Sequence, residues 1–203
     1  MLSAKDIKCD TVPTAGSVQF KLLKICTPTH FAARLLAHKT SNSSHWRTLD
    51  YEQRYEQLQQ QLSSYFATSD NCIMPQLPQL SDVCVRRLGP NGYERVAITH
   101  VPQAANTDAN AVLRVKHLDL NTVICHAKLS ELLVCPPTLQ QIAPLALDLR
   151  LSGIVPCQGE EIWQRCDNVS IGKLLHVGAV YEAQVDFGLS HAIFVKDLQL
   201  PSL

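Results

Sequence analysis

The sequence predicts a mostly β fold with helices, in which one small barrel interrupts a second, five-stranded barrel of the OB type. The first observation is a run of short alternating segments between Leu80 and Pro137, with turn residues at about every tenth position. The second is a long segment of helical period just before that run. The third is that the strands on either side of the run are too few to bury a face alone, so we expect them to close one barrel together.

Two strands and a helix are predicted before the small barrel. Val18 and Phe20 alternate with polar residues, which is typical of a half-buried strand, here over 17–26. A second apolar segment over 31–38 is predicted to return beside it as a hairpin. From 49 to 66 the apolar period becomes that of a helix. The apolar stripe of this helix consists of Tyr51, Tyr55, Leu58, Leu62, Tyr65 and Phe66.

Four strands of the small barrel are predicted from their period of two and from the turns between them. Gly89-Pro90-Asn91-Gly92 separates the first two strands, and the residues from Asp119 to Thr122 form a tight turn between the last two. A polar loop separates the middle pair. The predicted strands cover 82–87, 93–101, 111–118 and 123–128.

After the small barrel the sequence predicts a helical turn, a strand, a short helix and a hairpin. Pro136-Pro137 opens the helical turn, because proline is tolerated in the first turn of a helix. Leucine at every second position from Leu145 to Leu151 predicts a half-buried strand. The helical turn covers 138–142, the short helix 158–166 and the hairpin 175–198, with its turn at Gly188.

The composition narrows the classes of function. The 18 basic and 18 acidic residues cancel, whereas a surface that binds phosphate backbones normally carries a basic excess, so nucleic-acid binding is not expected. No two of the eight cysteines are spaced as C-x-x-C, and the sequence has no zinc-finger spacing. We therefore expect reduced thiols, no metal and no cofactor. No apolar run approaches 18 residues, so we expect no membrane span.

No catalytic pattern is evident among the titratable residues. No two histidines are four residues apart, and no carboxylate cluster accompanies them. Asp148 and Arg150 share one face of a predicted strand, but a nuclease centre would need several acidic metal ligands besides arginines around a phosphate. We therefore predict no catalytic residues and do not expect an enzyme.

The order of these segments resembles the extended Tudor domain, in which a Tudor barrel is inserted into a staphylococcal-nuclease-like (SN-like) OB fold and a long helix joins the two. Residues 82–87 and 93–96 are similar to the family's first two barrel strands, which carry D-G-x-W-Y-R-A. The stretch from Val115 to Thr122 is similar to the signature V-x-x-I-D-Y-G-N. Leu129 to Leu132 matches the L-x-x-L turn, and Pro136 to Trp163 is similar to the return into the outer barrel.

The resemblance implies how the chain is divided. We expect a Tudor barrel of the SH3-like type inside a split SN-like barrel. The predicted parts are a flexible leader over 1–16, the first part of the SN-like barrel over 17–48, the linker helix over 49–67, a linker over 68–79, the Tudor barrel over 80–135 and the second part of the SN-like barrel over 136–203.

The resemblance also implies a non-catalytic protein-protein interaction module from a scaffold protein of germline piRNA-mediated gene silencing. Members of the family bind symmetrically dimethylated arginine in the N-terminal tails of Piwi-type Argonaute proteins, through a cage of aromatic rings and one Asn. Other Tudor scaffold proteins are implied as further partners. The implied location is the cytoplasm, in the perinuclear germline granules called nuage.

Transferred onto this sequence, the cage is incomplete. Leu88 and Leu120 stand where the family has aromatic residues, Tyr93 keeps a ring, and His117 offers a weaker one. Because each good ring contributes about 0.5–2 kcal/mol, we expect an arginine-containing peptide to bind without requiring methylation. The predicted peptide-binding residues are Leu88, Tyr93, His117, Asp119, Leu120 and Asn121.

Two details of this site stay open in the sequence. If Asn121 occupies the left-handed turn position that the family gives to Gly, Thr122 takes the place of the cage Asn; a shift of one residue puts Asn121 there instead. Asp119 either caps the turn or pairs with an arginine of the peptide. Arg86, Arg87 and Arg95 are interpreted as a solvated face, with a local basic patch as the alternative.

Two other functions are alternatives to peptide binding. Single-stranded RNA could bind the OB surface, where the strand over 181–187 offers aromatic side chains for stacking. The domain could instead serve self-association, through the start of the chain or through the Tyr- and Gln-rich helix.

Overall fold

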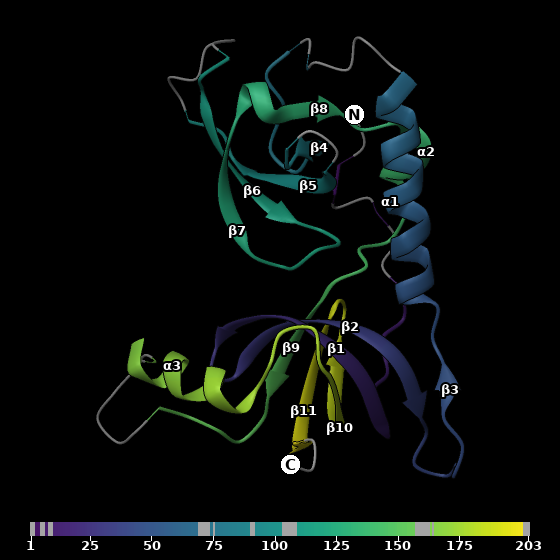
Figure 1. Ribbon diagram of the computed structural model, residues 1–203. Coiled ribbons are helices and arrows are strands. Elements are labelled where there is room, and N and C mark those ends of the chain that lie inside the picture. Colours follow the sequence, from purple (N-terminus) through teal and green to yellow (C-terminus); the bar gives the residue numbers. More distant parts are fainter. Residues whose placement is uncertain are drawn as a thin grey trace. The chain divides into compact units, whose positions relative to one another are not determined.

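The computed structural model describes residues 3, 4, 7, 10–68, 74, 76–89, 92–102, 109–156, 163 and 165–200, with side chains after 163 from 169 onward. The chain divides into two compact units. The first unit consists of Met1–Cys9 and Gln53–Leu145, and the second of Asp10–Glu52 and Ala146–Leu203. Each unit has a sheet of its own (Figure 1).

The second unit is a closed five-stranded barrel. β1 pairs with both β2 and β10, β10 with β11, β11 with β9, and β9 with β2, so the ring of strands closes on itself. The short β3 adds a sixth strand beside β2. The strands are β1 (Ser17–Thr27), β2 (His30–Lys39), β3 (Arg47–Thr48), β9 (Leu147–Leu151), β10 (Val180–Leu189) and β11 (Ala192–Gln199). The mostly β fold class with an OB-type barrel is thus confirmed.

The predicted alternation places the core of this barrel. Val18, Phe20 and Leu22 are buried, while the residues between them are only partly buried. Phe20 lies against Tyr181 of β10, with ring centroids 6.0 Å apart. A strand with one apolar face can close a barrel because that face turns inward all along it.

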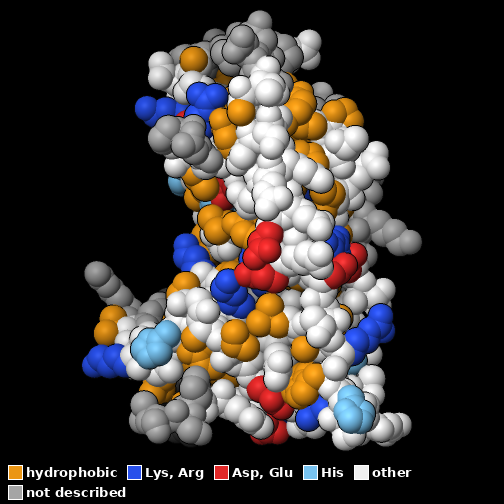
Figure 2. Space-filling model, turned by 45° about the vertical axis from the view of Figure 1, so that its right-hand side comes forward, with side chains coloured by type: hydrophobic (Ala, Val, Ile, Leu, Met, Phe, Trp, Pro, Cys, Tyr) orange, Lys and Arg blue, Asp and Glu red, His pale blue; other side chains and the backbone are white. Residues whose placement is uncertain are grey.

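The long helix α1 (Tyr51–Thr68) confirms the helix predicted over 49–66. Leu58, Leu62 and Phe66 are buried, but Tyr65 of the predicted stripe is 42% exposed. The exposed face of α1 is made mainly of glutamine and serine, and Figure 2 shows this face as largely neutral. Most of the stability of a helix in a protein comes from packing of its apolar face, and in α1 the buried stripe supplies this contact.

The first unit contains a strongly bent sheet with the strand order β7-β6-β5-β4-β8, all antiparallel. Its interior is one apolar cluster, which includes Cys84, Val96, Val115 and Ala127. The strands are β4 (Val83–Arg87), β5 (Tyr93–His100), β6 (Val112–His117), β7 (Ile124–Lys128) and β8 (Leu132–Val134), with a 3-10 turn η1 (Leu129–Glu131) before the last. The first four confirm the predicted strands to within a residue at each end.

The central strand β5 is buried on both faces. Val96 and Ile98 belong to the interior cluster. On the other face, Tyr93 stacks on Phe66 of α1 with ring centroids 4.8 Å apart, and Arg95 is completely buried. The prediction of an exposed Arg95 is therefore wrong, because its guanidinium is enclosed by the segment that follows β8.

The remaining elements differ from prediction in two places. The short α2 (Pro137–Gln140) forms where the helical turn was expected. The helix α3 (Arg165–Leu174) is not predicted, and most of the helix expected over 158–166 lies outside the described residues. The last hairpin turns at Ser190-His191, with φ 52° at Ser190, while Gly188 lies within β10. Among the described residues, no helix is long and apolar enough to cross a membrane.

Candidate functional site

Two loops of the small barrel lie at the same end of its sheet. β4 ends at Arg87 and β5 begins at Tyr93, while β6 ends at His117 and β7 begins at Ile124. Because neighbouring strands are antiparallel throughout, both connections lie at one end. We call this end, formed by the described residues of 86–94 and 117–125, the barrel mouth.

The inward-facing positions at the barrel mouth carry polar side chains. Each of these positions lies two residues along its strand from a residue of the apolar interior, on the side nearer the mouth. Because side chains alternate between the two faces of a strand, each position points to the same face as that core residue. Arg86 follows Cys84, Glu94 precedes Val96, His117 follows Val115, and Cys125 precedes Ala127. We call Arg86, Glu94, His117 and Cys125, together with Glu131 of η1, the mouth cluster.

The mouth cluster is held by a continuous set of contacts. His117 Nδ1 is 2.6 Å from Glu94 Oε2, and His117 Nε2 is 3.1 Å from Cys125 Sγ. Arg86 Nη1 donates to Cys125 Sγ at 3.2 Å, and Arg86 Nη2 is 3.1 Å from Glu131 Oε2. Glu94 Oε1 is buried without a hydrogen-bond partner, 3.9 Å from Arg86 Nη1. The contacts fill the barrel end with charged and polar groups.

Tyr93 does not join this cluster. It is 9% exposed and lies against Phe66, on the strand face opposite to that of Glu94. Its neighbour Glu94 occupies the inward position at the mouth and contacts His117. The structure therefore brings Glu94, rather than Tyr93, together with the predicted site residue His117.

Asp119 is also fully buried. Its two carboxylate oxygens accept from Arg95 Nη2 at 2.6 Å and Nε at 2.8 Å, and Oδ1 also accepts from the backbone N–H of Leu145 at 3.2 Å. The sequence leaves open whether Asp119 pairs with an arginine of the peptide. In the structure this carboxylate already pairs with Arg95 of the same chain.

Leu88, Leu120 and Asn121 lie in the two loops of the mouth. Leu88 is 47% and Leu120 38% exposed, so both present apolar surface. Asn121 Oδ1 accepts the backbone N–H of Val123 at 2.8 Å, which closes the turn. Asn121 is not among the described non-glycine residues with positive φ, so it does not take the left-handed position, and Thr122 is buried.

Sequence reasoning missed Arg86, Glu94 and Cys125 as residues of the mouth. The signal that could have found them is the alternation of each strand, because the next inward-facing residue lies two positions beyond the last buried core residue. In the described part of the chain, this step leads to charged side chains, a thiol and one imidazole instead of a set of aromatic rings. That part contains no group of three or more His, Cys, Asp or Glu residues arranged to hold a metal ion.

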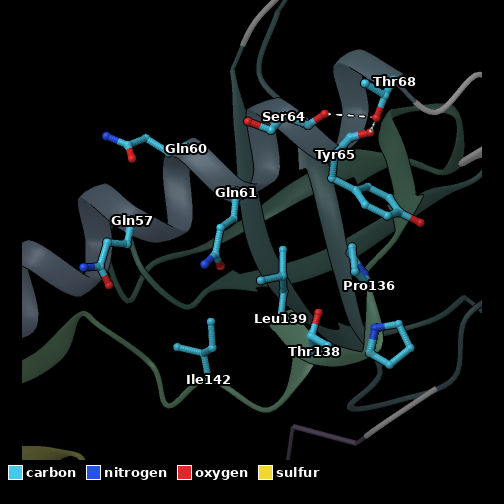
Figure 3. Close-up of a pocket in the computed structure, with 11 residues that line it drawn as sticks. Gln57, Gln60, Gln61, Ser64, Tyr65, Thr68, Pro136, Thr138, Leu139 and Ile142 are labelled. Carbon is cyan, nitrogen blue, oxygen red and sulfur yellow. Dashed lines mark hydrogen bonds between the residues drawn. The ribbon is translucent and has the colours of Figure 1, made fainter.

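A groove of about 1140 Å³ lies elsewhere on the first unit, between α1 and the segment around α2. In Figure 3, Gln61 and Tyr65 extend from the helix on one side, with Pro136, Leu139 and Ile142 on the other. Its lining residues are amide, hydroxyl and apolar, without an ionisable carboxylate or amine. The groove can therefore offer hydrogen bonds and apolar contact.

Comparison with known proteins adds a relative in sequence and several in structure. The chain is 32% identical over 203 residues to BoYb of Drosophila melanogaster, which is named as an ATP-dependent RNA helicase. The match covers 97% of this chain, and the chain spans 18% of the length of that relative. No protein-family model matches the chain.

Several extended Tudor domains of solved structure resemble the fold. Domain TD3 of mouse TDRD1, in complex with a MILI peptide containing dimethylarginine, has a TM-score of 0.75 and 14% identity, covering 98% of this chain and 89% of that one. The domain of human TDRD1, in complex with a symmetrically dimethylated peptide, has a TM-score of 0.72 and 18% identity over 96% and 86%. A single-residue variant of the domain of Drosophila melanogaster Papi, in complex with an unmethylated Piwi N-terminal peptide, has a TM-score of 0.71 and 11% identity, covering 93% of this chain and 91% of that one.

These coverages include both units of the chain. The protein therefore has the extended Tudor fold: a Tudor-type barrel together with an OB-type barrel built from segments on either side of it in sequence.

Proposed function

We propose that this chain is a non-catalytic module that binds an arginine-containing peptide from the N-terminal tail of a Piwi or Argonaute protein, without requiring arginine methylation. The structurally similar domains support peptide binding, since their complexes contain a MILI peptide, a Piwi peptide and a further symmetrically dimethylated peptide. A single-residue variant of the Papi domain is present in complexes with both the unmethylated and the symmetrically dimethylated Piwi peptide. These complexes support peptide binding by this fold with unmethylated as well as methylated arginine.

The observation that carries the proposal is the composition of the barrel mouth. A methylated guanidinium is held by aromatic faces, which replace the water that its methyl groups exclude. Here the inward positions are Arg86, Glu94, His117 and Cys125, and His117 already contacts Glu94 and Cys125. The Arg86 guanidinium at this end acts on both forms alike, because methylation leaves the charge of arginine unchanged. The mouth therefore lacks a physical basis for preferring the methylated form.

The rim of the mouth supplies the apolar contacts of the proposed site. Leu88 and Leu120 are exposed in two neighbouring loops, where they could cover the aliphatic stem of an arginine side chain. We include Leu88, Leu120 and Asn121 in the proposed rim, with the mouth cluster behind it. Tyr93 and Asp119 support this site from the buried side.

The setting of the whole protein is part of the proposal. From the resemblance to extended Tudor domains, we propose a module of a scaffold protein of the piRNA pathway, in the cytoplasm and in the perinuclear granules of germ cells; the Piwi peptide in the Papi complexes supports this setting. Within that protein the module would have a scaffold role, recruiting a Piwi partner, with other Tudor proteins as further partners. Single-stranded RNA binding and self-association are the alternatives, and nucleic acid is not an expected partner because the charges balance.

The test is a titration of the purified chain with two matched peptides from a Piwi N-terminal tail, one with unmethylated and one with symmetrically dimethylated arginine, by calorimetry. We expect dissociation constants that agree within about threefold, because no set of rings distinguishes the two forms. A preference of tenfold or more for the methylated peptide contradicts methylation independence. Binding of neither peptide, together with salt-sensitive binding of an RNA oligonucleotide, supports the RNA alternative.

Matched variants locate the site. Leu120→Ala removes apolar contact at the mouth, and we expect weaker binding of both peptides by a similar factor. Val112→Ala is the control, because Val112 is 45% exposed at the start of β6, at the opposite end of the same sheet. If the two variants bind the peptides with equal affinity, the binding surface is not at the mouth.

A further inference from the structure

A thiol, an imidazole and a carboxylate form a continuous chain of contacts at the barrel mouth. Cys125 Sγ is 3.1 Å from His117 Nε2, and His117 Nδ1 is 2.6 Å from Glu94 Oε2. His117 and Glu94 are 7% and 2% exposed, whereas Cys125 is only partly buried. We propose that Cys125 is an activated thiol and a covalent modification site for small electrophiles, with hydrogen peroxide as the oxidant class. The proposal does not depend on peptide binding.

Glu94 fixes the role of the imidazole. A carboxylate accepts hydrogen bonds and does not donate them, so the contact with Glu94 places the proton of neutral His117 on Nδ1. Nε2 is then an acceptor, and it is the ring atom that faces the sulfur. This is the order of nucleophile, base and orienting group that activates a cysteine for reaction.

Arg86 acts on the sulfur from another strand. Its Nη1 lies 3.2 Å from Cys125 Sγ, and since a guanidinium only donates, the sulfur is the acceptor. A cation in this position favours the thiolate over the thiol. The charged and titratable groups of the cluster are thus Arg86 from β4, Glu94 from β5, His117 from β6 and Glu131 from η1.

The second carboxylate oxygen of Glu94 is consistent with the same role. Glu94 Oε1 is buried and has no hydrogen-bond partner, and the Arg86 guanidinium lies 3.9 Å from it. A buried negative charge beside the ring stabilises the imidazolium that forms when the thiol gives up its proton.

The reaction with hydrogen peroxide balances as follows. The proton of Cys125 moves to His117 Nε2, and the thiolate sulfur attacks one oxygen of the peroxide. The S–O bond forms as the O–O bond breaks, so the sulfur is oxidised to a sulfenic acid and the peroxide is reduced. The leaving hydroxide takes the proton from the imidazolium and departs as water.

Three other described cysteines are internal controls. Burial raises the pKa of Cys84 and the pKa of Cys135 to about 12. Burial also raises the pKa of Cys26, which is half-buried in β1. None of the three has the Glu-His chain of Cys125, so each reports the reactivity of a cysteine in this protein without activation.

The experiment measures the alkylation rate of each cysteine in the folded 203-residue protein with iodoacetamide, from pH 5.5 to 9, by peptide mass spectrometry. At pH 6.5 we expect Cys125 to react at least about tenfold faster than Cys26, with Cys84 and Cys135 unmodified. Treatment with hydrogen peroxide followed by dimedone should label Cys125 first. A Cys125 rate equal to or below that of Cys26 overturns the proposal, and this result needs no variant.

Two variants test the assigned roles. His117→Asn should slow Cys125 alkylation at pH 6.5 at least about tenfold and move the rise of the rate to higher pH. His126→Asn is the matched control, because His126 is exposed beside Cys125 on β7, and it should leave the rate unchanged. An unchanged rate in folded His117→Asn, verified by circular dichroism, rejects activation by this imidazole. If that variant does not fold, the pH profile of the unmodified chain decides.

Discussion

Arg95 and Asp119 form a fully buried, bidentate ion pair that joins β5 to the turn after β6. Arg95 Nη2 donates to Asp119 Oδ1 at 2.6 Å and Nε to Oδ2 at 2.8 Å. The remaining donors of Arg95 bond to the backbone carbonyls of Leu139, Ile142 and Ala143. All five guanidinium N–H groups are therefore satisfied without water, which makes this arginine the link between the sheet and the segment after α2.

Removal of the Asp119 charge should strongly destabilise the first unit. Asp119→Asn leaves the Arg95 guanidinium buried with its charge uncompensated, which costs about 3–5 kcal/mol in the free energy of unfolding. The double change Arg95→Met with Asp119→Leu should not restore stability, because three backbone carbonyls would lose their donors. Urea unfolding measures both. A loss below about 1 kcal/mol for Asp119→Asn, or full recovery in the double variant, contradicts this account.

Much of the fold follows from patterns that extend over many residues. The helix α1 and the strands β1, β2 and β10 have long apolar periods, and the sequence predicts them closely. The helix α3 has only ten residues and a Gly inside it, so its apolar period is too short to stand out. The sequence predicts a turn at Gly188, but this glycine lies within β10, where a Cβ would overlap the carbonyl oxygen of Pro13. A glycine is required at this position because the backbone of a segment distant in sequence lies against it.

The site was harder to predict because a strand reverses its faces at each residue. Tyr93 and Glu94 are adjacent, so an offset of one residue after the glycine-rich turn exchanges the buried ring for the carboxylate at the mouth. The sequence motif locates the segment that forms the site, but it does not show which face of the strand each residue occupies. Likewise, the side chain of Asn121 closes its turn through the N–H of Val123, a local bond that replaces the expected left-handed residue.

The stacking of Tyr93 on Phe66 predicts a structural role for the tyrosine ring. Tyr93→Ala should lower the free energy of unfolding by about 3–5 kcal/mol, because it leaves a cavity beneath α1. Tyr93→Phe keeps the ring, so stability and peptide affinity should both stay near those of the unmodified chain. Thermal unfolding and the peptide titration check this pair. Loss of affinity in Tyr93→Phe at unchanged stability would instead make the hydroxyl part of the binding surface.

Glu52 should make stability depend on pH in the acidic range. Burial raises its pKa, but hydrogen bonds from Arg34 at 2.8 Å and Lys21 at 2.6 Å lower the pKa by more, so that it lies below the ordinary 4.5. A carboxyl whose pKa is lower in the folded state stabilises fully above its unfolded pKa. That stabilisation is lost as the pH falls through the folded pKa.

The matching variant is Glu52→Gln, which should cost about 1 kcal/mol at pH 7, a value reduced for the partial exposure of the carboxylate. The difference from the unmodified chain should shrink as the pH falls below 4.5. Glu56→Gln, on the exposed face of α1, is the control and should show little effect at either pH. A Glu52→Gln deficit that stays constant down to pH 3 would show that the ion pairs are not its cause.

Gly188 and Gly172 give opposite predictions for the same substitution. At Gly188 in β10, a Cβ would overlap the Pro13 carbonyl oxygen and lie 3.0 Å from Val12 Cγ2, so Gly188→Ala forces a backbone shift that should cost about 1–3 kcal/mol. At Gly172 in α3 a Cβ meets nothing within 4 Å, and alanine is the better helix former, so Gly172→Ala should stabilise by about 0.5–1 kcal/mol. Paired urea unfolding curves test the two. If Gly188→Ala is as stable as the unmodified chain, the segment around Pro13 does not pack against β10 in solution, and the close approach that requires a glycine there is absent.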